Sequence, residues 1–253
     1  MKTKELVRYL DELLKTSEIP DDALNGLQVE HEEREIQRVG GAVDISEVAV
    51  AEAIAKNIDF LIVHHGLYWF GQPTAITGPY FRRVRGLIQN GIALYASHLP
   101  LDLHPEFGNN AVILRELGWQ DFGSLGNYKG LEIGRYTEFS PSRTLSDLVQ
   151  ELESFFGVPP LTVWEFGPSE IRKVAVVSGK AVSLLPDLKQ AGVDLLVTGE
   201  TSHAHYWLAQ ELGVHVVFFG HYVTERYGVK ALGKHLQERF GLEFHFLDLP
   251  TGL

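Results

Sequence analysis

Apolar residues recur with helical spacing at the start of the chain and in short runs further on, and the two patterns predict different elements. Residues 3–16 place their leucines on one face of a helix, so they predict an amphipathic helix. From Val39 onward, short apolar runs alternate with stretches of helical spacing. We expect strands at 39–43, 59–63 and 92–96, and helices at 46–56, 80–89 and 110–117. This alternation is typical of a mostly parallel sheet with helices on both faces.

The same alternation returns later in the chain, after a region of different character. Glycines are frequent at 121–135, which we interpret as a boundary between two halves. A strand at 131–139, a Ser-capped helix from Pro141 to Phe156 and a strand at 161–166 follow. We therefore predict a first α/β lobe at 1–125 and a second at 126–253, with an α+β elaboration at 126–170. The later strands are expected at 174–177, 194–197, 214–219 and 242–247, and the helices at 181–191, 202–212 and 224–240.

Parts of the two halves repeat each other. The run Lys-Asn-Ile-Asp-Phe-Leu-Ile at 56–62 matches Ala-Gly-Val-Asp-Leu-Leu-Val at 191–197. Each half also has a strand, then a histidine, then a carboxylate four positions later at a helix start: His98 with Asp102, and His221 with Glu225. We predict two similar three-layer α/β lobes, an internal pseudo-repeat, with equivalent strand ends facing a metal site between the lobes.

The chemistry of these strand ends indicates metal binding. His64 and His65 directly follow the apolar run 60–63, and ligands in open parallel sheets bind beyond the carboxyl ends of the strands. Imidazole is the commonest protein ligand for borderline divalent metals, and a carboxylate can bridge two ions. The predicted ligands of a dinuclear site are His64, His65, Asp102, His221 and Glu225. The alternative is that Asp102 caps a helix and Glu225 complements a helix dipole.

Other polar residues near the strand ends have less certain roles. His98 is a metal ligand, a proton shuttle or a group that orients Asp102, and the sequence leaves these open. Glu200 follows the strand equivalent to 60–63 and is a candidate for proton transfer. The loop 178–180 between a strand and a helix offers backbone amides to an anion. Four further histidines are predicted to lie outside the site or to be structural: His203, His205, His215 and His245.

The composition narrows the possible chemistry and partners. The 253 residues are 45% hydrophobic and 22% charged, as in ordinary globular proteins. No cysteine is present, so thiolate zinc sites, disulfides and cysteine nucleophiles are excluded. The formal net charge of -11 argues against nucleic acid or an anionic membrane as a partner. Because the chain shows no apolar run long enough to span a membrane and no signal-peptide core, we expect a cytoplasmic protein.

Several of these residues lie in motifs that resemble a known family. The motifs are Asn25-Gly-Leu-Gln-Val29, Val63-His-His-Gly66 with Trp69, His98-Leu-Pro-Leu-Asp102 with Gly108-Asn-Asn110, Thr198-Gly-Glu200 and Gly220-His-Tyr-Val-Thr-Glu-Arg226. Over almost the whole chain, they are similar to the dinuclear-metal, ring-forming family of GTP cyclohydrolase 1 type 2 homologues, in the short form without an inserted domain. The resemblance implies two α/β lobes and a toroidal homohexamer. It also implies metal sites facing the inner cavity, with ligands at His64, His65, Asp102, His221 and Glu225.

Two functional hypotheses follow. The first is a metal-dependent hydrolase that acts on a small anionic, nucleotide-like substrate and uses two divalent ions of zinc, iron, manganese or nickel. In it, His98 or Glu200 would move protons. GTP cyclohydrolase-like chemistry enters through the resemblance alone. The second hypothesis is a non-catalytic hexamer for metal storage, metal delivery or scaffolding, which would release its metal readily to a weak chelator.

Overall fold

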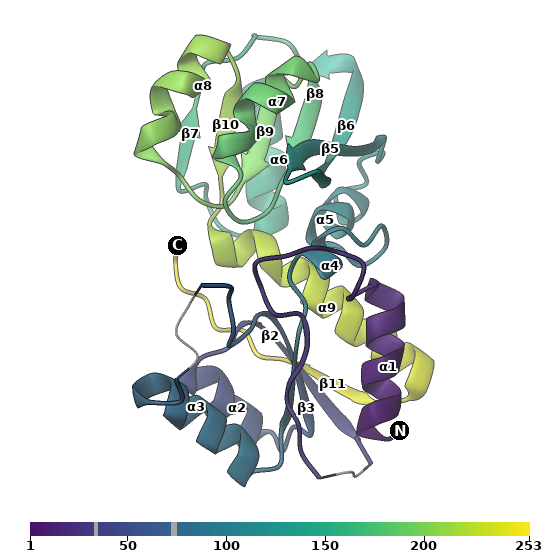
Figure 1. The fold of residues 1–253 in the computed structure, drawn as a ribbon. Helices are drawn as coiled ribbons and strands as arrows, with labels where there is room; N and C mark the ends of the chain where they lie inside the picture. The colour runs from purple at the N-terminus through teal and green to yellow at the C-terminus, as the bar shows by residue number, and fades with distance from the viewer. Residues whose placement is uncertain (33–34, 72–74) are drawn as a thin grey trace. The chain divides into compact units, whose positions relative to one another are not determined.

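The chain folds into two compact α/β units in a computed structural model that describes residues 1–32, 35–71 and 75–253 (Figure 1). The first unit is Met1–Phe107 with Gly228–Leu249, and the second is Gly108–Tyr227 with Pro250–Leu253. The prediction of two α/β lobes is confirmed. The observed division differs from the predicted one at 125/126, because the last strand, β11 (Glu243–Phe246), pairs with β2 (Arg38–Asp44) of the first unit.

The first unit is built on a five-stranded sheet that is mostly parallel, as predicted. Its order is β1-β4-β3-β2-β11, and only the edge strand β1 runs antiparallel to its neighbour among these pairings. The central strand β3 is an apolar run buried on both faces, which is why its sequence is continuous rather than alternating. β3 spans Phe60–His65, β1 spans Gly26–Val29 and β4 spans Ala93–Ala96.

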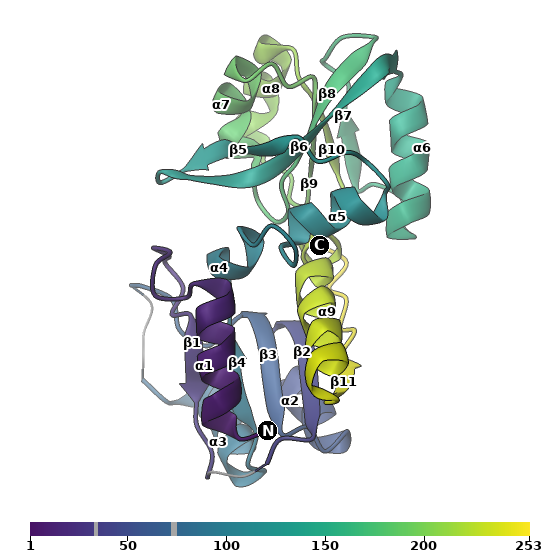
Figure 2. The ribbon, with the colours of Figure 1, turned by 90° about the vertical axis from the view of Figure 1, so that its right-hand side faces the viewer.

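Helices cover both faces of this sheet (Figure 2). One face packs against α1 (Thr3–Leu14) and the later part of α9 (His221–Phe240), where Leu6, Leu10 and Leu236 join one apolar core. The other face packs against α2 (Glu47–Ala55) and α3 (Gly78–Gln89) in a second core. A short helix, α4 (Leu99–Asp102), follows β4 directly.

The second unit contains a six-stranded mixed sheet. Its centre is parallel, whereas the pairings of β7 with β10, β6 with β8 and β5 with β6 are antiparallel. The sheet order is β5-β6-β8-β9-β10-β7. The strands are β5 (Gly123–Tyr128), β6 (Leu131–Arg143), β7 (Thr162–Trp164), β8 (Ile171–Val176), β9 (Leu195–Thr198) and β10 (His215–Phe218).

The helices of the second unit lie on both faces of its sheet, with α7 and α8 on one and α6 on the other (Figure 1). The helices are α5 (Asn109–Glu116), α6 (Leu145–Phe156), α7 (Leu185–Gln190) and α8 (Tyr206–Leu212), and two 3₁₀ turns precede α7 and α8 at Val182–Leu184 and His203–His205. Among the helices that the structure describes in either unit, none has the length and apolar character needed to cross a lipid bilayer.

Equivalent hydrogen bonds from backbone N–H groups to an aspartate side chain confirm the internal repeat. In the first unit the Asp59 carboxylate accepts the N–H groups of Gln37 and Arg38, both at 2.9 Å. In the second unit the Asp194 carboxylate accepts the N–H groups of Arg172 and Lys173 at 2.9 and 3.0 Å. The shared element order is a helix, an antiparallel edge strand and three parallel strands with their helices.

Two local predictions are wrong for a common reason. The glycine-rich stretch expected to separate the lobes is instead the β5–β6 hairpin, whose two strands pair from Gly123 to Tyr136. The helix expected to begin at Pro141 begins at Leu145, with the Thr144 hydroxyl accepting from Asp147 N. Pro141 itself lies in β6. In both places, strand pairing outweighs the local turn and cap signals: β5 pairs with the adjacent β6, and Arg143 of β6 pairs with Ile171 of β8.

Candidate metal centre

His64 and His65 close the central strand of the first unit, and both rings are fixed through the same nitrogen. Nδ1–H of the fully buried His64 donates to the Ser97 carbonyl at 2.9 Å. Nδ1–H of His65 donates to the carboxylate of Asp44, at the end of β2, at 2.8 Å. Because an accepting oxygen holds each Nδ1 proton, the lone pair of each ring is on Nε2, as in a metal-binding histidine.

His98 is fixed in the same way by a loop residue. It lies at the N-cap of α4, and its Nδ1–H donates to the carboxylate of Asp21 at 2.9 Å. Burial alone would raise the pKa of the Asp21 carboxyl. The hydrogen bond and charge of His98, together with donors on Asn25 and Leu99, outweigh burial and hold this pKa below its usual value. Asp21 is therefore an anion wherever the fold is intact near neutral pH.

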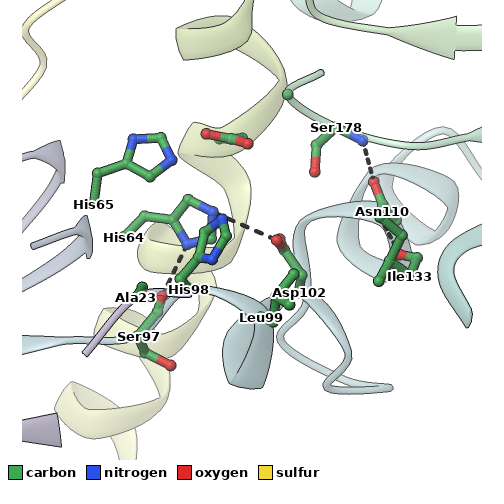
Figure 3. A network of polar contacts seen from close by, with 12 residues as sticks. Ala23, His64, His65, Ser97, His98, Leu99, Asp102, Asn110, Ile133 and Ser178 are labelled. Carbon is green, nitrogen blue, oxygen red and sulfur yellow. Dashed lines mark hydrogen bonds and ion pairs between the residues drawn. The ribbon is translucent and has the colours of Figure 1, made fainter. Parts of the chain in front are cut away.

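The three imidazoles and one carboxylate form a cluster within the first unit (Figure 3). One ring nitrogen from each of His64, His65 and His98 lies within 4.8 Å of the others. Oδ2 of the largely buried Asp102, the last residue of α4, is 3.5 Å from Nε2 of His64. The first unit therefore contains a group of side chains that could hold a metal ion.

The turn after the histidine pair requires a residue without a side chain. A Cβ at Gly66 would lie 2.4 Å from Gln28 Nε2 and 2.6 Å from Ala96 Cβ. Gln28 is needed there because its Oε1 accepts the N–H of Leu67 at 2.7 Å. Trp69, three residues further on, has its ring edge-on to that of His98, with 5.0 Å between the two ring centroids. Residues of the predicted motifs at 25–29 and 63–69 thus hold the chain in place beside the histidine cluster.

The second unit presents a histidine held between two carboxylates. His221, the first residue of α9, donates through Nδ1–H to Glu200 Oε1 at 2.7 Å. Its Nε2 is 2.9 Å from Oε2 of Glu225, one turn along the helix and nearly fully buried. A ring nitrogen and a carboxylate oxygen come this close when a proton or a cation lies between them.

Gly179 makes room for this pair. A Cβ there would lie 2.2 Å from Glu225 Oε1 and 3.2 Å from His221 Nε2. The Gly179 backbone has φ of +65°, and its carbonyl accepts the N–H of Gly199 at 3.0 Å and that of Glu200 at 2.8 Å. The loop between β8 and α7 therefore sets the positions of the carboxylates.

The suggested anion site at 178–180 does not fit the observed hydrogen bonds. The Ser178 N–H donates to Asn110 Oδ1 at 2.8 Å (Figure 3), and the Gly179 N–H donates to Thr224 Oγ1 at 3.1 Å. Asn110 in turn donates to the Ile133 carbonyl at 2.8 Å. These two amides serve to anchor the loop.

Three of the four further histidines have local partners. His215 accepts the Gly167 N–H and donates to the Pro168 carbonyl, as expected of a structural histidine. His205 pairs with Ser202, and His245 with Glu243. Asp21 and Asp44 were not among the predicted site residues. For Asp44 a signal was available, because it follows an apolar run at the edge of the sheet where His64 and His65 lie.

The donor atoms of these two groups of side chains fit a divalent metal. Four imidazoles, those of His64, His65, His98 and His221, have Nδ1 bonded to an accepting oxygen, and Asp102 and Glu225 each lie near one of the Nε2 atoms. Nitrogen and oxygen donors of this kind suit zinc, iron, manganese and nickel. The fold and donor set define a two-lobed α/β protein with a candidate histidine–carboxylate metal site.

The comparison with known proteins then identifies the family. The chain belongs to the Duf34/NIF3 (NGG1p interacting factor 3) family, which matches residues 1–251. The GTP cyclohydrolase 1 type 2 homolog of Pyrococcus abyssi is 43% identical over the full length of both chains, and that of Archaeoglobus fulgidus likewise 43%. The crystal structure of TTHA1606 from Thermus thermophilus matches with a TM-score of 0.89 at 45% identity, covering 100% of both chains. The resemblance to GTP cyclohydrolase 1 type 2 homologues is confirmed.

Proposed function

We propose that donor residues of both units together hold two divalent metal ions. The ligands are His64, His65, Asp102, His221 and Glu225, joined by His98. The observation that carries this proposal is the shared fixation of the imidazoles through Nδ1, which is the hallmark of metal-ligating histidine. His98 is supported as a ligand by its ring nitrogen, which lies beside those of His64 and His65.

We further propose that the protein is a hydrolase acting on a small anionic substrate. Metal ions bound here would polarise a substrate oxygen and acidify a water molecule. Two divalent ions carry four positive charges, and Asp102 and Glu225 return two negative ones, so an anionic group is attracted locally. Glu200, whose side chain is 38% exposed, is suited to take up a proton at the oxygen that does not hold His221. The names of the relatives support a nucleotide-like substrate.

Metal analysis tests the ligand set. Purified wild type and Glu225→Ala are loaded with zinc, iron, manganese or nickel and freed of excess metal by gel filtration. We expect Glu225→Ala to lose metal, because a nearly buried carboxylate beside His221 is removed. The matched control is Glu238→Ala, an exposed glutamate on the same helix, which should keep the wild-type content. Full metal content in Glu225→Ala would refute the ligand assignment.

A substrate screen tests the activity. GTP, other nucleotides and phosphoesters are incubated with protein loaded with each metal in turn, and Asp102→Ala serves as the inactive comparison. Turnover that depends on both metal and Asp102 supports the hydrolase. Metal that passes quickly to a weak chelator, with no turnover of any compound, would instead identify a storage, delivery or scaffold protein.

A homohexamer is the proposed assembly. Support comes from the resemblance to a ring-forming family and from large apolar side chains exposed on α2 and α3. Val48 is 59% exposed, Phe81 45% and Ile88 60%. Single exposed apolar residues are normal on a protein surface, whereas a group of them indicates an interaction surface. Light scattering should give six times the chain mass, and a monomer would contradict the ring.

A further inference from the structure

We propose that Asp21 is a positioning residue that aims His98 at His64 and His65, with Asn25 as its partner. The inference rests on the proposed metal function and extends it to a loop of the first unit. Residues 21–25 would position His98, a proposed metal ligand that lies 77 positions after Asp21 in the chain.

The Asp21 carboxylate is surrounded by donors that fix its orientation. Its side chain is 3% exposed. It accepts from Nδ1 of His98 at 2.9 Å, from the Leu99 N–H at 2.9 Å, from the Ala23 N–H at 3.1 Å and from Asn25 Nδ2 at 2.9 Å. A carboxylate has about four acceptor sites, so these donors account for its capacity. Such a group cannot rotate without breaking several hydrogen bonds at once.

The same loop also holds the backbone of His98. Asn25 Oδ1 accepts the His98 N–H at 2.7 Å, while Asn25 Nδ2 donates to Asp21. Both N–H groups of His98, on the backbone and on the ring, therefore end on residues 21–25. With its main chain and Nδ1 fixed, the His98 ring has one direction left for Nε2, which is toward the cluster with His64 and His65.

The energetic consequence follows from what an outer hydrogen bond does for a metal-binding imidazole. The carboxylate partner keeps the proton on Nδ1 and the lone pair on Nε2, and it holds the ring in its binding orientation. Loss of such a partner typically weakens metal binding about 10–100-fold. A purely structural Asp21 would instead stabilise the start of α4 and leave metal affinity unchanged.

A double-mutant cycle on zinc affinity separates these roles. The affinity of metal-free protein is measured by competition with a chromophoric chelator for wild type, Asp21→Ala, His98→Ala and the double variant. We expect Asp21→Ala to bind zinc about 10–100-fold more weakly. In the His98→Ala background the same change should have little further effect, because Asp21 acts through His98. Asp22→Ala, an exposed aspartate in the same loop, is the matched control and should bind as wild type.

Two outcomes would overturn the proposal. Wild-type zinc affinity in Asp21→Ala would show that Asp21 is only structural. Equal losses in the presence and absence of His98 would show that it does not act through that ring. If Asp21→Ala fails to fold, Asp21→Asn, which keeps the volume but loses the charge, goes through the same cycle. The proposed function fails separately, when Glu225→Ala retains its metal.

Discussion

Gly179 illustrates how one position decides which side chain enters a metal site. The strand register of the repeat makes it the equivalent of Asp44 in the first unit, because Val39 pairs with Phe60 as Val174 pairs with Leu195. In the first unit, Asp44 uses its carboxylate to hold His65. In the second, the matching position has no side chain, and the space next to it is taken by Glu225. Each unit thus places a carboxylate beside a histidine, but from a different position of the repeat.

Replacing Gly179 should therefore remove metal, not merely stability. Gly179→Ala forces a left-handed φ on an alanine, which costs about 1–2 kcal/mol, and places Cβ 2.2 Å from Glu225 Oε1. Gly192→Ala is the control, since Gly192 also has positive φ but no atom within 4 Å of the place that a Cβ would take. We expect similar losses in the free energy of unfolding from denaturant titration, with metal lost from Gly179→Ala alone. Equal metal content in both variants would disprove this role.

At the residue scale, the sequence pointed to the candidate donors but not to the residues that hold them in place. His64, His65 and Asp102 could be predicted because they end or follow apolar strands at one edge of a sheet. The structure brings these three together within the first unit, and His221 with Glu225 within the second. Asp21 could not be predicted, because its role depends on the path of a loop that contacts His98 from far along the chain.

At the element scale, the strands were predictable wherever burial on both faces makes a continuous apolar run. β3 and β9 are of this kind. At β6, the strand predicted at 131–139 is confirmed, but it continues to Arg143, where a Ser-Pro step typical of a helix start had predicted the beginning of a helix. Pairing of Arg143 with Ile171 of β8 extends the strand, and that partner is not visible from the local sequence.

The repeated aspartates should contribute equally to the two sheets. Asp59 joins β2 to β3, and Asp194 joins β8 to β9, each by accepting two backbone N–H groups. Hydrogen bonds to a charged group contribute about 1.5–3 kcal/mol each, and loss of their acceptor leaves two amides to be solvated. Asp59→Ala and Asp194→Ala should each lower the free energy of unfolding by about 2–4 kcal/mol in denaturant titrations. If only one of the two substitutions lowers the free energy of unfolding, the two aspartates share a geometry but do not contribute equally to stability.

The contact between α1 and α9 should make stability fall in mild acid. His235 on α9 lies beside the hydroxyl of Tyr9, and burial lowers its pKa, although Glu106 raises it. Burial raises the pKa of Tyr9, so Tyr9 remains the donor and His235 the acceptor. A base with a lowered pKa binds its proton more weakly in the folded state. Its contribution is complete above the unfolded pKa of about 6.5 and is lost as the pH falls below it.

Replacement by glutamine tests this pH dependence, since Gln can still accept the Tyr9 hydroxyl. The melting temperature of metal-free wild type should fall between about pH 7.5 and about pH 5.5 by more than that of His235→Gln. His104, whose pKa burial also lowers, contributes to the slope that remains in the variant. Identical slopes in the two proteins would show that His235 is not responsible.

At the scale of the whole molecule, each unit has the parts of an independent domain. The first has its own sheet and two apolar cores, and the second has its own sheet with a core under α7 and α8. The proposed ligands are divided between them, with His64, His65, His98 and Asp102 in the first and His221 and Glu225 in the second. A metal centre made from both sets would therefore link two units that each have a sheet and an apolar core of their own.

This division predicts that metal controls the cooperativity of unfolding. A ligand that binds only the folded state stabilises by about 2.7 kcal/mol at a concentration of about 100 times its dissociation constant. A shared metal centre is lost when either unit unfolds, so both units gain from it together. In calorimetry, the metal-loaded protein should give a single transition, and chelation should lower and broaden it or split it in two.

The boundary between the units lies inside α9, between Tyr227 and Gly228, so some coupling persists without metal. The informative comparison is therefore between loaded and chelated protein of the same sequence. Glu225→Ala should resemble chelated wild type at any metal concentration, whereas Glu238→Ala should resemble the loaded protein. If chelation shifts the transition of one unit alone, the metal is held within that unit, and the joint centre is refuted. Because each half of the donor set is already arranged within its own unit, this experiment asks only whether the two halves act on the same ions.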